Sequence, residues 1–325
     1  MAELLAALAS GTIFGSALTL AGVASPRVII DQLRLTNFHM LLAFMSASAC
    51  SAVIVVAANH TGLARLGHRK DSSLGVLGRY DGNIIGGALQ GVGMALTGAC
   101  PGTVLVQAAA GVGRGFWVML GGLLGGAAFV KWKKKTAART DAPEGKHTIM
   151  QKTGLSASAV VLGYETLLLA VITAANSLAP TGTYFLNPAV GGLLIGAAQA
   201  ASVLFSKKTL GVSSAYEDAG QMFWALLEGK TPPGWGNVVF AAGVAAGARA
   251  TMHYVPFTLE AMLPEVPVSI LAALIGGFAI IFGGRLAGGC TSGHGISGMA
   301  TMSFSSFITV ASMFAGGIGA ALVLS

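Results

Sequence analysis

Apolar runs long enough to cross a lipid bilayer recur along the whole chain. A transmembrane helix needs about 20 predominantly apolar residues. Runs that approach or exceed this length occupy 3–24, 37–58, 83–98, 115–130, 155–175, 187–206, 236–252, 267–288 and 303–324. Only 10% of the 325 residues are charged, whereas soluble domains average about 25%. These features predict an all-α polytopic membrane protein with about nine spanning helices and no room for a separate soluble domain.

Two glycine-rich motifs each end an apolar run beside a cysteine. The first reads Gly-Val-Gly-Met-Ala-Leu-Thr-Gly-Ala-Cys-Pro-Gly over 91–102, and the second reads Gly-Gly-Arg-Leu-Ala-Gly-Gly-Cys-Thr-Ser-Gly over 283–293. Alignment of Cys100 with Cys290 also brings into register the pairs Gly86/Gly276, Gly87/Gly277, Gly93/Gly283, Leu96/Leu286 and Gly98/Gly288. This self-similarity indicates an internal repeat in which each copy contributes one half of a single site.

A basic stretch at 131–153 divides the chain between the two motifs. The apolar run 155–175 that follows it has no obvious counterpart in the first half. One unpaired span inverts the second half relative to the first, which produces two inverted, pseudo-symmetric halves. We therefore expect a first repeat half at 1–130, a basic linker loop with an unpaired transmembrane helix at 131–180, and a second repeat half at 181–325.

Positive charge is concentrated in two connections, and the net charge is +7. One connection, 65–79, carries three arginines, a histidine and a lysine, and the other is the basic stretch 131–153. Short Lys/Arg-rich loops of membrane proteins stay in the cytoplasm. We therefore interpret both clusters as topological signals in a multi-pass protein of the cell (plasma or inner) membrane, with the lipid bilayer and no nucleic acid as partner. Both loops lie on one side only if 80–130 enters the membrane and returns.

The two motifs predict broken helices. Pro101 cannot continue the helix that ends at Cys100, and the second half breaks through the glycine-rich segment 288–293. Lipid tolerates such breaks only where the freed backbone groups face protein or a water-filled cavity. The breaks therefore indicate re-entrant or discontinuous helices around a cavity near the midplane of the membrane.

The expected cavity suits a small anion. The short helix after each break points unpaired N–H groups and a partial positive charge into the cavity, and hydroxyls and an arginine are present with little carboxylate nearby. The residues that we expect to bind substrate are Cys100, Cys290, Thr103, Thr291, Ser292, His294, Arg285, Gly98, Gly102 and Gly289.

Several of these side chains also have simpler interpretations. Arg285 could extend its charge towards water or pair with a carbonyl, and His294 could instead form a hydrogen bond within its helix. We interpret Cys50 as a small buried packing residue. Glu165, in the unpaired helix, could couple transport to protons, because intramembrane carboxylates are rare and often functional.

The two repeat-matched thiols favour a sulfur-bearing substrate. Sulfur is soft and polarisable and suits a soft, sulfur-containing ligand. A neutral S–H donor fits a transit site better than a thiolate, which would repel an anion. The three cysteines do not fit a disulfide framework or a zinc site, and the sequence predicts no cofactor.

The motifs resemble a known family. Leu96-Thr-Gly-Ala-Cys-Pro-Gly-Thr103 and Gly283-Gly-Arg-Leu-Ala-Gly-Gly-Cys-Thr-Ser-Gly-His-Gly-Ile-Ser-Gly298 resemble the paired signatures of the YeeE/YedE family of sulfur-transport membrane proteins. The resemblance implies thiosulfate uptake through an hourglass-shaped, pseudo-symmetric protein, in which Cys100 and Cys290 handle the ion through S–H hydrogen bonds. It also implies a small cytosolic sulfur-carrier protein as a partner. Thiosulfate transporters of this kind carry a further cysteine near the first re-entrant turn, and the corresponding region 19–26 has none.

Three functions remain open at this point. We expect a membrane transporter, not an enzyme, that takes up a small inorganic sulfur anion, with thiosulfate as first choice. One alternative is a membrane-embedded sulfurtransferase in which Cys290 forms a persulfide. The other is a channel for a small neutral solute, which would not depend on substrate charge.

Overall fold

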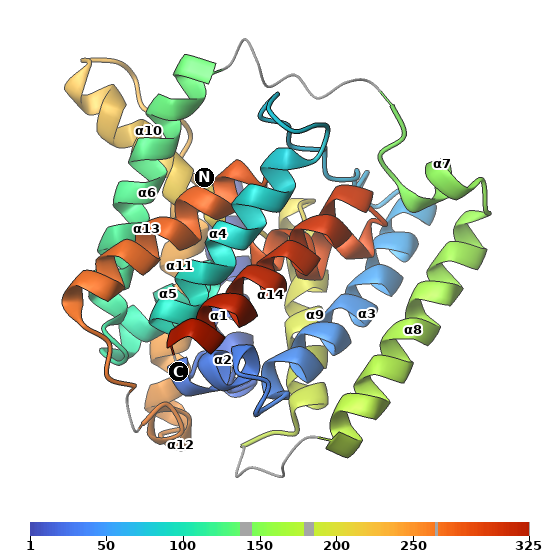
Figure 1. Cartoon of the computed structure of the whole chain (residues 1–325), viewed down its shortest axis with the longest axis horizontal. Coiled ribbons are helices and arrows are strands. Elements are labelled where there is room, and N and C mark those ends of the chain that lie inside the picture. The colour runs from blue at the N-terminus through green and yellow to red at the C-terminus, as the bar shows by residue number, and fades with distance from the viewer. Residues whose placement is uncertain (137–144, 179–184, 264–265, 325) are drawn as a thin grey trace.

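A computed structural model describes the chain apart from residues 137–144, 179–184, 264–265 and 325. Regular structure in the described residues is helical, with one isolated β-bridge between Thr148 and Ser303. In chain order the helices are α1 (Ala2–Leu20), α2 (Pro26–Leu33), α3 (His39–His60), α4 (Asp81–Thr97), α5 (Pro101–Ala110), α6 (Gly115–Thr136), α7 (Ile149–Thr153), α8 (Ala157–Leu178), α9 (Pro188–Ser206), α10 (Ser213–Leu227), α11 (Gly236–Tyr254), α12 (Phe257–Glu260), α13 (Ile270–Leu286), the π-helix η1 (Thr291–Gly298) and α14 (Phe304–Leu324) (Figure 1).

Each of the nine predicted apolar runs coincides with a helix. Within the described residues, seven helical segments are long and apolar enough to cross a membrane, or eight if the bent pair of α13 and η1 forms one span. Helix α11 is not among them, because Asn237, Arg249 and His253 lower its mean hydropathy. The predicted all-α polytopic membrane fold is thus confirmed, with fewer clear spans than apolar runs.

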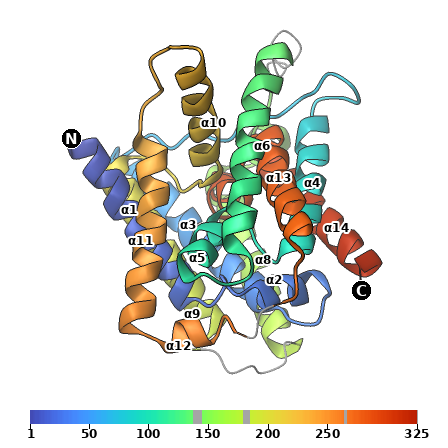
Figure 2. The same cartoon turned by 90° about the vertical axis from the view of Figure 1, so that its left-hand side faces the viewer.

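The two basic connections lie on the same side of the molecule. Asp71 in the first connection accepts from Arg79 Nε at 2.5 Å and contacts His147 Nδ1, in the second connection, at 3.2 Å. The rings of His68 and His147 stack with their centroids 5.1 Å apart. Figure 2 shows the start of α4 and the end of α6 on this side. The segment between them therefore enters the bundle and returns, as expected from the charge pattern.

Helices α4 and α13 cross at glycines that the sequence repeat had paired. Gly86 lies against the backbone of Gly283, and Gly93 lies against the backbone of Gly276. In the repeat, Gly86 corresponds to Gly276 and Gly93 to Gly283. Each glycine of α4 therefore contacts the repeat equivalent of the other α4 glycine. Two elements related by a twofold axis make contacts of this kind.

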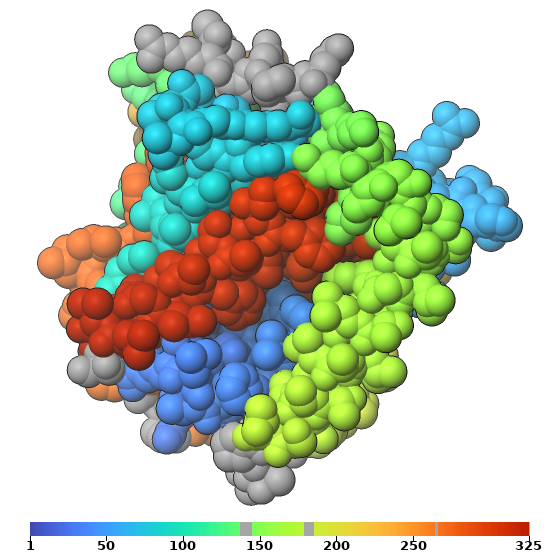
Figure 3. Space-filling view, turned by 45° about the vertical axis from the view of Figure 1, so that its right-hand side comes forward, coloured from blue at the N-terminus to red at the C-terminus, as the bar shows by residue number. Residues whose placement is uncertain are grey.

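The contacts of the surrounding helices also occur in repeat-related pairs. Helix α4 packs on α14 as α13 packs on α6, α1 packs on α11 as α9 packs on α3, and α5 contacts α11 as η1 contacts α3. Helix α8 packs against α3 and lies along the outside of the bundle (Figure 3). It belongs to the segment predicted to be unpaired. The end of that segment, at 179–180, lies outside the described residues, as do 137–144 in the basic linker and 181–184 at the start of the predicted second half.

Candidate functional site

The first break places Cys100 at the start of a short buried helix. Helix α4 ends at Gly98, whose φ of +64° favours glycine. Cys100 then precedes Pro101, which occupies the first position of α5. The Thr103 hydroxyl accepts from the Cys100 backbone N–H at 2.8 Å and lies 3.4 Å from Cys100 Sγ. The thiol is thereby fixed at the positive end of α5.

The side chain of Gln107 bridges backbone carbonyls at this break. Its Nε2 donates to the carbonyl of Gly98 at 2.8 Å and to the carbonyl of Ala24 at 2.9 Å. The two carbonyls belong to the end of α4 and to the turn between α1 and α2, so one side chain ties three segments together. No local sequence pattern marks Gln107, because its partners are set by tertiary packing.

The second break places Cys290 directly before the π-helix η1. Such helices are rare and frequent at functional sites, and η1 makes an angle of 43° with α13. Cys290 Sγ lies 3.4 Å from the hydroxyl of Ser292 and lies close to Ser213 on α10. Cys290 is almost completely buried, as is Cys100.

Two predicted site residues hold this second break together. His294 contacts Ser306 Oγ through Nδ1 at 2.8 Å and the Ala287 carbonyl through Nε2 at 3.2 Å. The Thr291 hydroxyl accepts from Gln90 Nε2 at 2.7 Å. Both ring nitrogens of His294 are therefore engaged by protein, but their partners lie on α14 and at the end of α13, not within its own helix as the simpler interpretation had it.

The three predicted site glycines lie at the breaks. Gly98 ends α4, and Gly102 is the second residue of α5, close to the side chain of Leu18. A Cβ at Gly289 would lie 2.9 Å from the His294 ring. Each glycine therefore allows another group to approach the break closely.

The structure brings the two thiols into one buried region. Cys100 and Cys290 are close enough to interact electrostatically with each other, and Tyr216 of α10 interacts with both. Tyr216 donates to the Pro101 carbonyl at 3.2 Å. The start of α10 completes this contact, because Val212, just before the helix, lies near Gly102, and Ser213, its first residue, lies close to Cys290. No periodic pattern in the sequence pointed to these residues.

Arg285 lies beside this region but is not a free cation. It forms an ion pair with Glu217 of α10, and its Nη1 lies 3.4 Å from the Ser213 hydroxyl. Burial raises the pKa of Glu217, but the positive charges of Arg285 and Lys133 outweigh burial and lower this pKa below its usual value. The expectation of little carboxylate near the site was therefore wrong: the ionised Glu217 comes from a helix that the apolar pattern did not predict.

Arg69 supplies a second guanidinium from the first basic connection. Its Nη2 would lie 3.3 Å from a Cβ placed on Gly293 or on Gly211, and it interacts electrostatically with Cys290. Its backbone N–H donates to Ser303 Oγ at 2.7 Å. Among the described residues Arg69 forms no ion pair. The sequence had marked Arg69 only as a topological charge.

Cys50 and Glu165 lie away from the thiols. Cys50 packs against Gly196 at the contact of α3 with α9. Glu165 lies on α8, close enough to Cys50 to interact with it electrostatically, and its buried Oε1 has no hydrogen-bond partner in the described part of the chain. Among their contacts in the described residues, neither is paired with Cys100 or Cys290.

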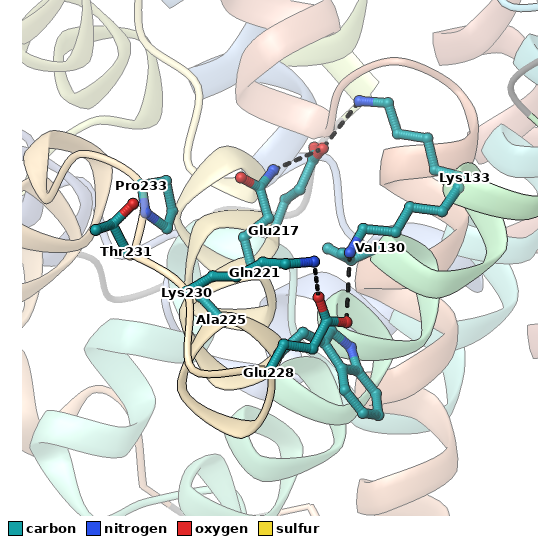
Figure 4. Close-up of a pocket in the computed structure, with 11 residues that line it drawn as sticks. Val130, Lys133, Glu217, Gln221, Ala225, Glu228, Lys230, Thr231 and Pro233 are labelled. Atoms are coloured by element: carbon teal, nitrogen blue, oxygen red, sulfur yellow. Dashed lines mark hydrogen bonds and ion pairs between the residues drawn. The ribbon is translucent and has the colours of Figure 1, made fainter.

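A cavity of about 510 Å³ opens between the end of α6 and α10, next to the Arg285–Glu217 pair (Figure 4). Its lining includes Lys133, Lys134, Glu217, Glu228 and Lys230. The described residues contain no group of three or more His, Cys, Asp or Glu side chains placed to hold a metal ion. The charged lining and the adjacent guanidinium suit a small anion.

Comparison with known proteins gives two consistent results. Residues 23–319 match the family described as sulphur transport. Two proteins of Xylella fastidiosa, each named a probable transporter, are also similar: that of strain Temecula1 is 30% identical over 135 residues, and that of strain 9a5c is 27% identical over 139. Each match covers 41% of this chain and 90% of the relative.

Proposed function

Because this chain belongs to the sulphur transport family, we propose that it takes up a small sulfur-containing anion, with thiosulfate as the first choice. The observation that carries the proposal is the placement of two buried thiols, Cys100 and Cys290, each directly before the short helix of a broken span, and both next to the same helix α10. A site that two halves build near the midplane is the common plan of secondary transporters.

The thiols act as weak donors to the passing anion. Each buried S–H group donates a soft hydrogen bond to the sulfur or oxygen of the ion, and the N-terminus of α5 adds backbone N–H groups with a partial positive charge. Weak binding at more than one position lets the ion enter and also leave. Thr103 and Ser292, next to the two thiols, complete the hydrogen-bonding surface.

Two guanidinium groups supply positive charge on the basic side. Arg69 and Cys290 both lie next to Gly293, and the Ser213 hydroxyl lies close to both Arg285 and Cys290. Arginine suits oxyanions because its planar group can donate two parallel hydrogen bonds. An ion that arrives on this side can therefore pass from guanidinium to thiol.

Residues 1–130 and 181–325 form two inverted halves in this proposal, and 131–180 connects them. The exchanged glycine contacts of α4 and α13 support it. Further support comes from the Xylella relatives, since 90% of each aligns with only 41% of this chain. Rocking of one half against the other would then expose the thiols to each side alternately.

The basic loops face the cytoplasm of a cell whose plasma or inner membrane holds the protein. The anion or its sulfur is then handed, on that face, to a small cytosolic sulfur-carrier protein. This orientation follows the charge of the two connections that meet at Asp71 and His147.

Uptake of radiolabelled thiosulfate into proteoliposomes tests the proposal, with Cys100→Ala, Cys290→Ala and the matched control Cys50→Ala. We expect each of the first two changes to reduce uptake by about tenfold or more, since an interaction with an ion is lost, and the control to transport normally. Full activity of both Cys100→Ala and Cys290→Ala would remove the thiols from the mechanism.

One observation favours a second candidate function, sulfur transfer. The Arg69 guanidinium beside Cys290 is an environment that promotes a nucleophilic thiolate. Cys290 Sγ would attack the outer sulfur of thiosulfate, forming a new S–S bond while the original S–S bond breaks and sulfite leaves with the electron pair. Mass spectrometry that finds one added sulfur atom on Cys290 after exposure to thiosulfate would establish this function, and an unmodified Cys290 would favour transport.

A further inference from the structure

The two glutamates of the cavity in Figure 4 have different surroundings. Glu228 pairs with Lys134 and Lys230 at the outer rim. Glu217 is the deeper of the two, because only 6% of its side chain is exposed, against 36% for Glu228. The cavity therefore offers one carboxylate near solvent and one that reaches into the protein.

The carboxylate of Glu217 connects an outer cation with an inner one. Its Oε1 accepts from Lys133 Nζ at 3.0 Å, and its Oε2 pairs with Arg285. The Lys133 side chain is 58% exposed, whereas that of Arg285 is 14% exposed. Glu217 therefore stands between the cavity and the buried guanidinium.

Arg285 has donors that the protein does not fully use. Its Nε is buried and has no acceptor among the residues that the structure describes. Its Nη1 lies 3.4 Å from Ser213 and 3.5 Å from Ser214, beyond ordinary hydrogen-bond lengths. A buried donor without an acceptor is unfavourable. An anion at this position would accept the hydrogen bonds that Arg285 lacks, next to Ser213 and Cys290.

Building on the proposed transport of a sulfur anion, we propose that Glu217 is the counter-ion that gates the pathway between this cavity and Cys290. Its carboxylate holds Arg285 while the site is empty. The anion then replaces the Glu217 carboxylate as the ion-pair partner of Arg285, while Glu217 remains paired with Lys133. The exchange keeps the buried guanidinium paired throughout, which avoids the cost of an isolated buried charge.

This exchange makes Glu217 a competitor of the substrate. Removal of its charge must strengthen anion binding and slow anion release, because nothing then displaces the ion from Arg285. A residue with only a structural role would weaken binding or leave it unchanged when altered. The sign of the effect therefore distinguishes the two roles.

Thiosulfate uptake by proteoliposomes provides the test, with Glu217→Gln compared against Glu228→Gln. Both changes remove one negative charge from the same cavity, but only Glu217 pairs with Arg285. We expect Glu217→Gln to lower the KM about tenfold and also to lower the maximal rate, within the usual range of coupling between sites. Glu228→Gln should change the KM less than about twofold.

A second pair of variants covers the case in which Glu217→Gln does not fold. Lys133→Gln frees the outer oxygen of Glu217, so the carboxylate should hold Arg285 more firmly and raise the KM. Lys134→Gln removes the same charge from the same cavity without touching Glu217, and should raise the KM less. Equal effects of the two lysine changes would overturn the gate.

The outcomes separate the gate from transport itself. If the wild-type protein moves no thiosulfate, the proposed function fails and the gate fails with it. If wild-type uptake is normal but Glu217→Gln raises the KM or behaves like Glu228→Gln, only the gate is overturned.

Discussion

Gly93 of α4 lies against the backbone of Gly276 of α13, so the two broken helices touch where neither carries a side chain. The same two helices meet again at Gly86 and Gly283, with the repeat-matched positions exchanged. Close approach of small residues is the usual way in which membrane helices associate. This contact fixes how the two thiol-bearing breaks are placed relative to each other.

Gly93→Ala should therefore destabilise the protein. A Cβ at this position would lie 2.6 Å from the Gly276 carbonyl oxygen, and overpacking of this kind costs about 1–3 kcal/mol. Thermal unfolding in detergent measures the loss. Gly319→Ala is the matched control, because a Cβ at Gly319 on α14 meets nothing within 4 Å. An equal melting temperature for Gly93→Ala and wild type would contradict the proposed close contact.

Much of the fold around the two helix breaks could be predicted from the sequence. The apolar runs, the duplicated Gly-Cys motifs and the helix breaks are local features, and they placed Cys100, Cys290 and the surrounding glycines correctly at two helix ends. These predictions succeed because backbone hydrogen bonding in lipid leaves few alternatives. The inverted direction of the second half, expected from the unpaired run 155–175, stays a prediction.

The charged surroundings of the thiols could not be predicted in the same way. Glu217 and Ser213 lie on α10, which is not apolar enough to stand out, and Arg69 lies in an irregular connection. All three reach the site through contacts between segments far apart in the chain. The π-helical form of η1 was also not predicted, because a glycine-rich segment has no distinctive period.

Arg69→Gln should weaken substrate binding without unfolding the protein. The guanidinium lies over Gly293 and near Cys290, whereas the ties of this residue to the fold come from its backbone N–H and carbonyl, which bond Ser303 and Ser305. Loss of a charged donor to the anion should raise the KM for thiosulfate by about tenfold.

The control for Arg69→Gln is Arg65→Gln, a change to an exposed arginine in the same connection. The two variants lose the same charge from the same loop. If Arg65→Gln raises the KM as much as Arg69→Gln, general attraction by the loop explains the effect and the specific contact does not.

Gln107→Glu should disrupt the first break. The change replaces the amide that donates to the carbonyls of Gly98 and Ala24 with a carboxylate that repels both oxygens. Buried polar groups left without partners cost about 1–3 kcal/mol, so both the melting temperature and thiosulfate uptake should fall. Retention of both properties would show that Gln107 does not hold the break together.

The stacking of His68 on His147 between the two basic connections should loosen in acid. Partial burial and the neighbouring charges of His147 and Lys70 lower the pKa of His68, although Asp71 opposes the shift. A histidine whose folded pKa lies below its unfolded value stabilises the fold above about pH 6.5, and this stability is lost as the pH falls below that value.

Hydrogen–deuterium exchange of 65–80, corrected for intrinsic rates, should therefore be faster at about pH 5.5 than at about pH 7.5. His68→Gln should reduce this difference, because a neutral amide does not titrate. Slower exchange in acid, or an unchanged difference in the variant, would assign the pH dependence to another group.

A cryo-EM map of the protein with thiosulfate is the most direct test of anion binding by the two thiols. We expect density for one anion within hydrogen-bonding distance of Cys100 Sγ and Cys290 Sγ, on a passage that leads past Arg285 to the cavity of Figure 4. A map in which the thiols face lipid, or in which the anion binds away from both, would contradict it.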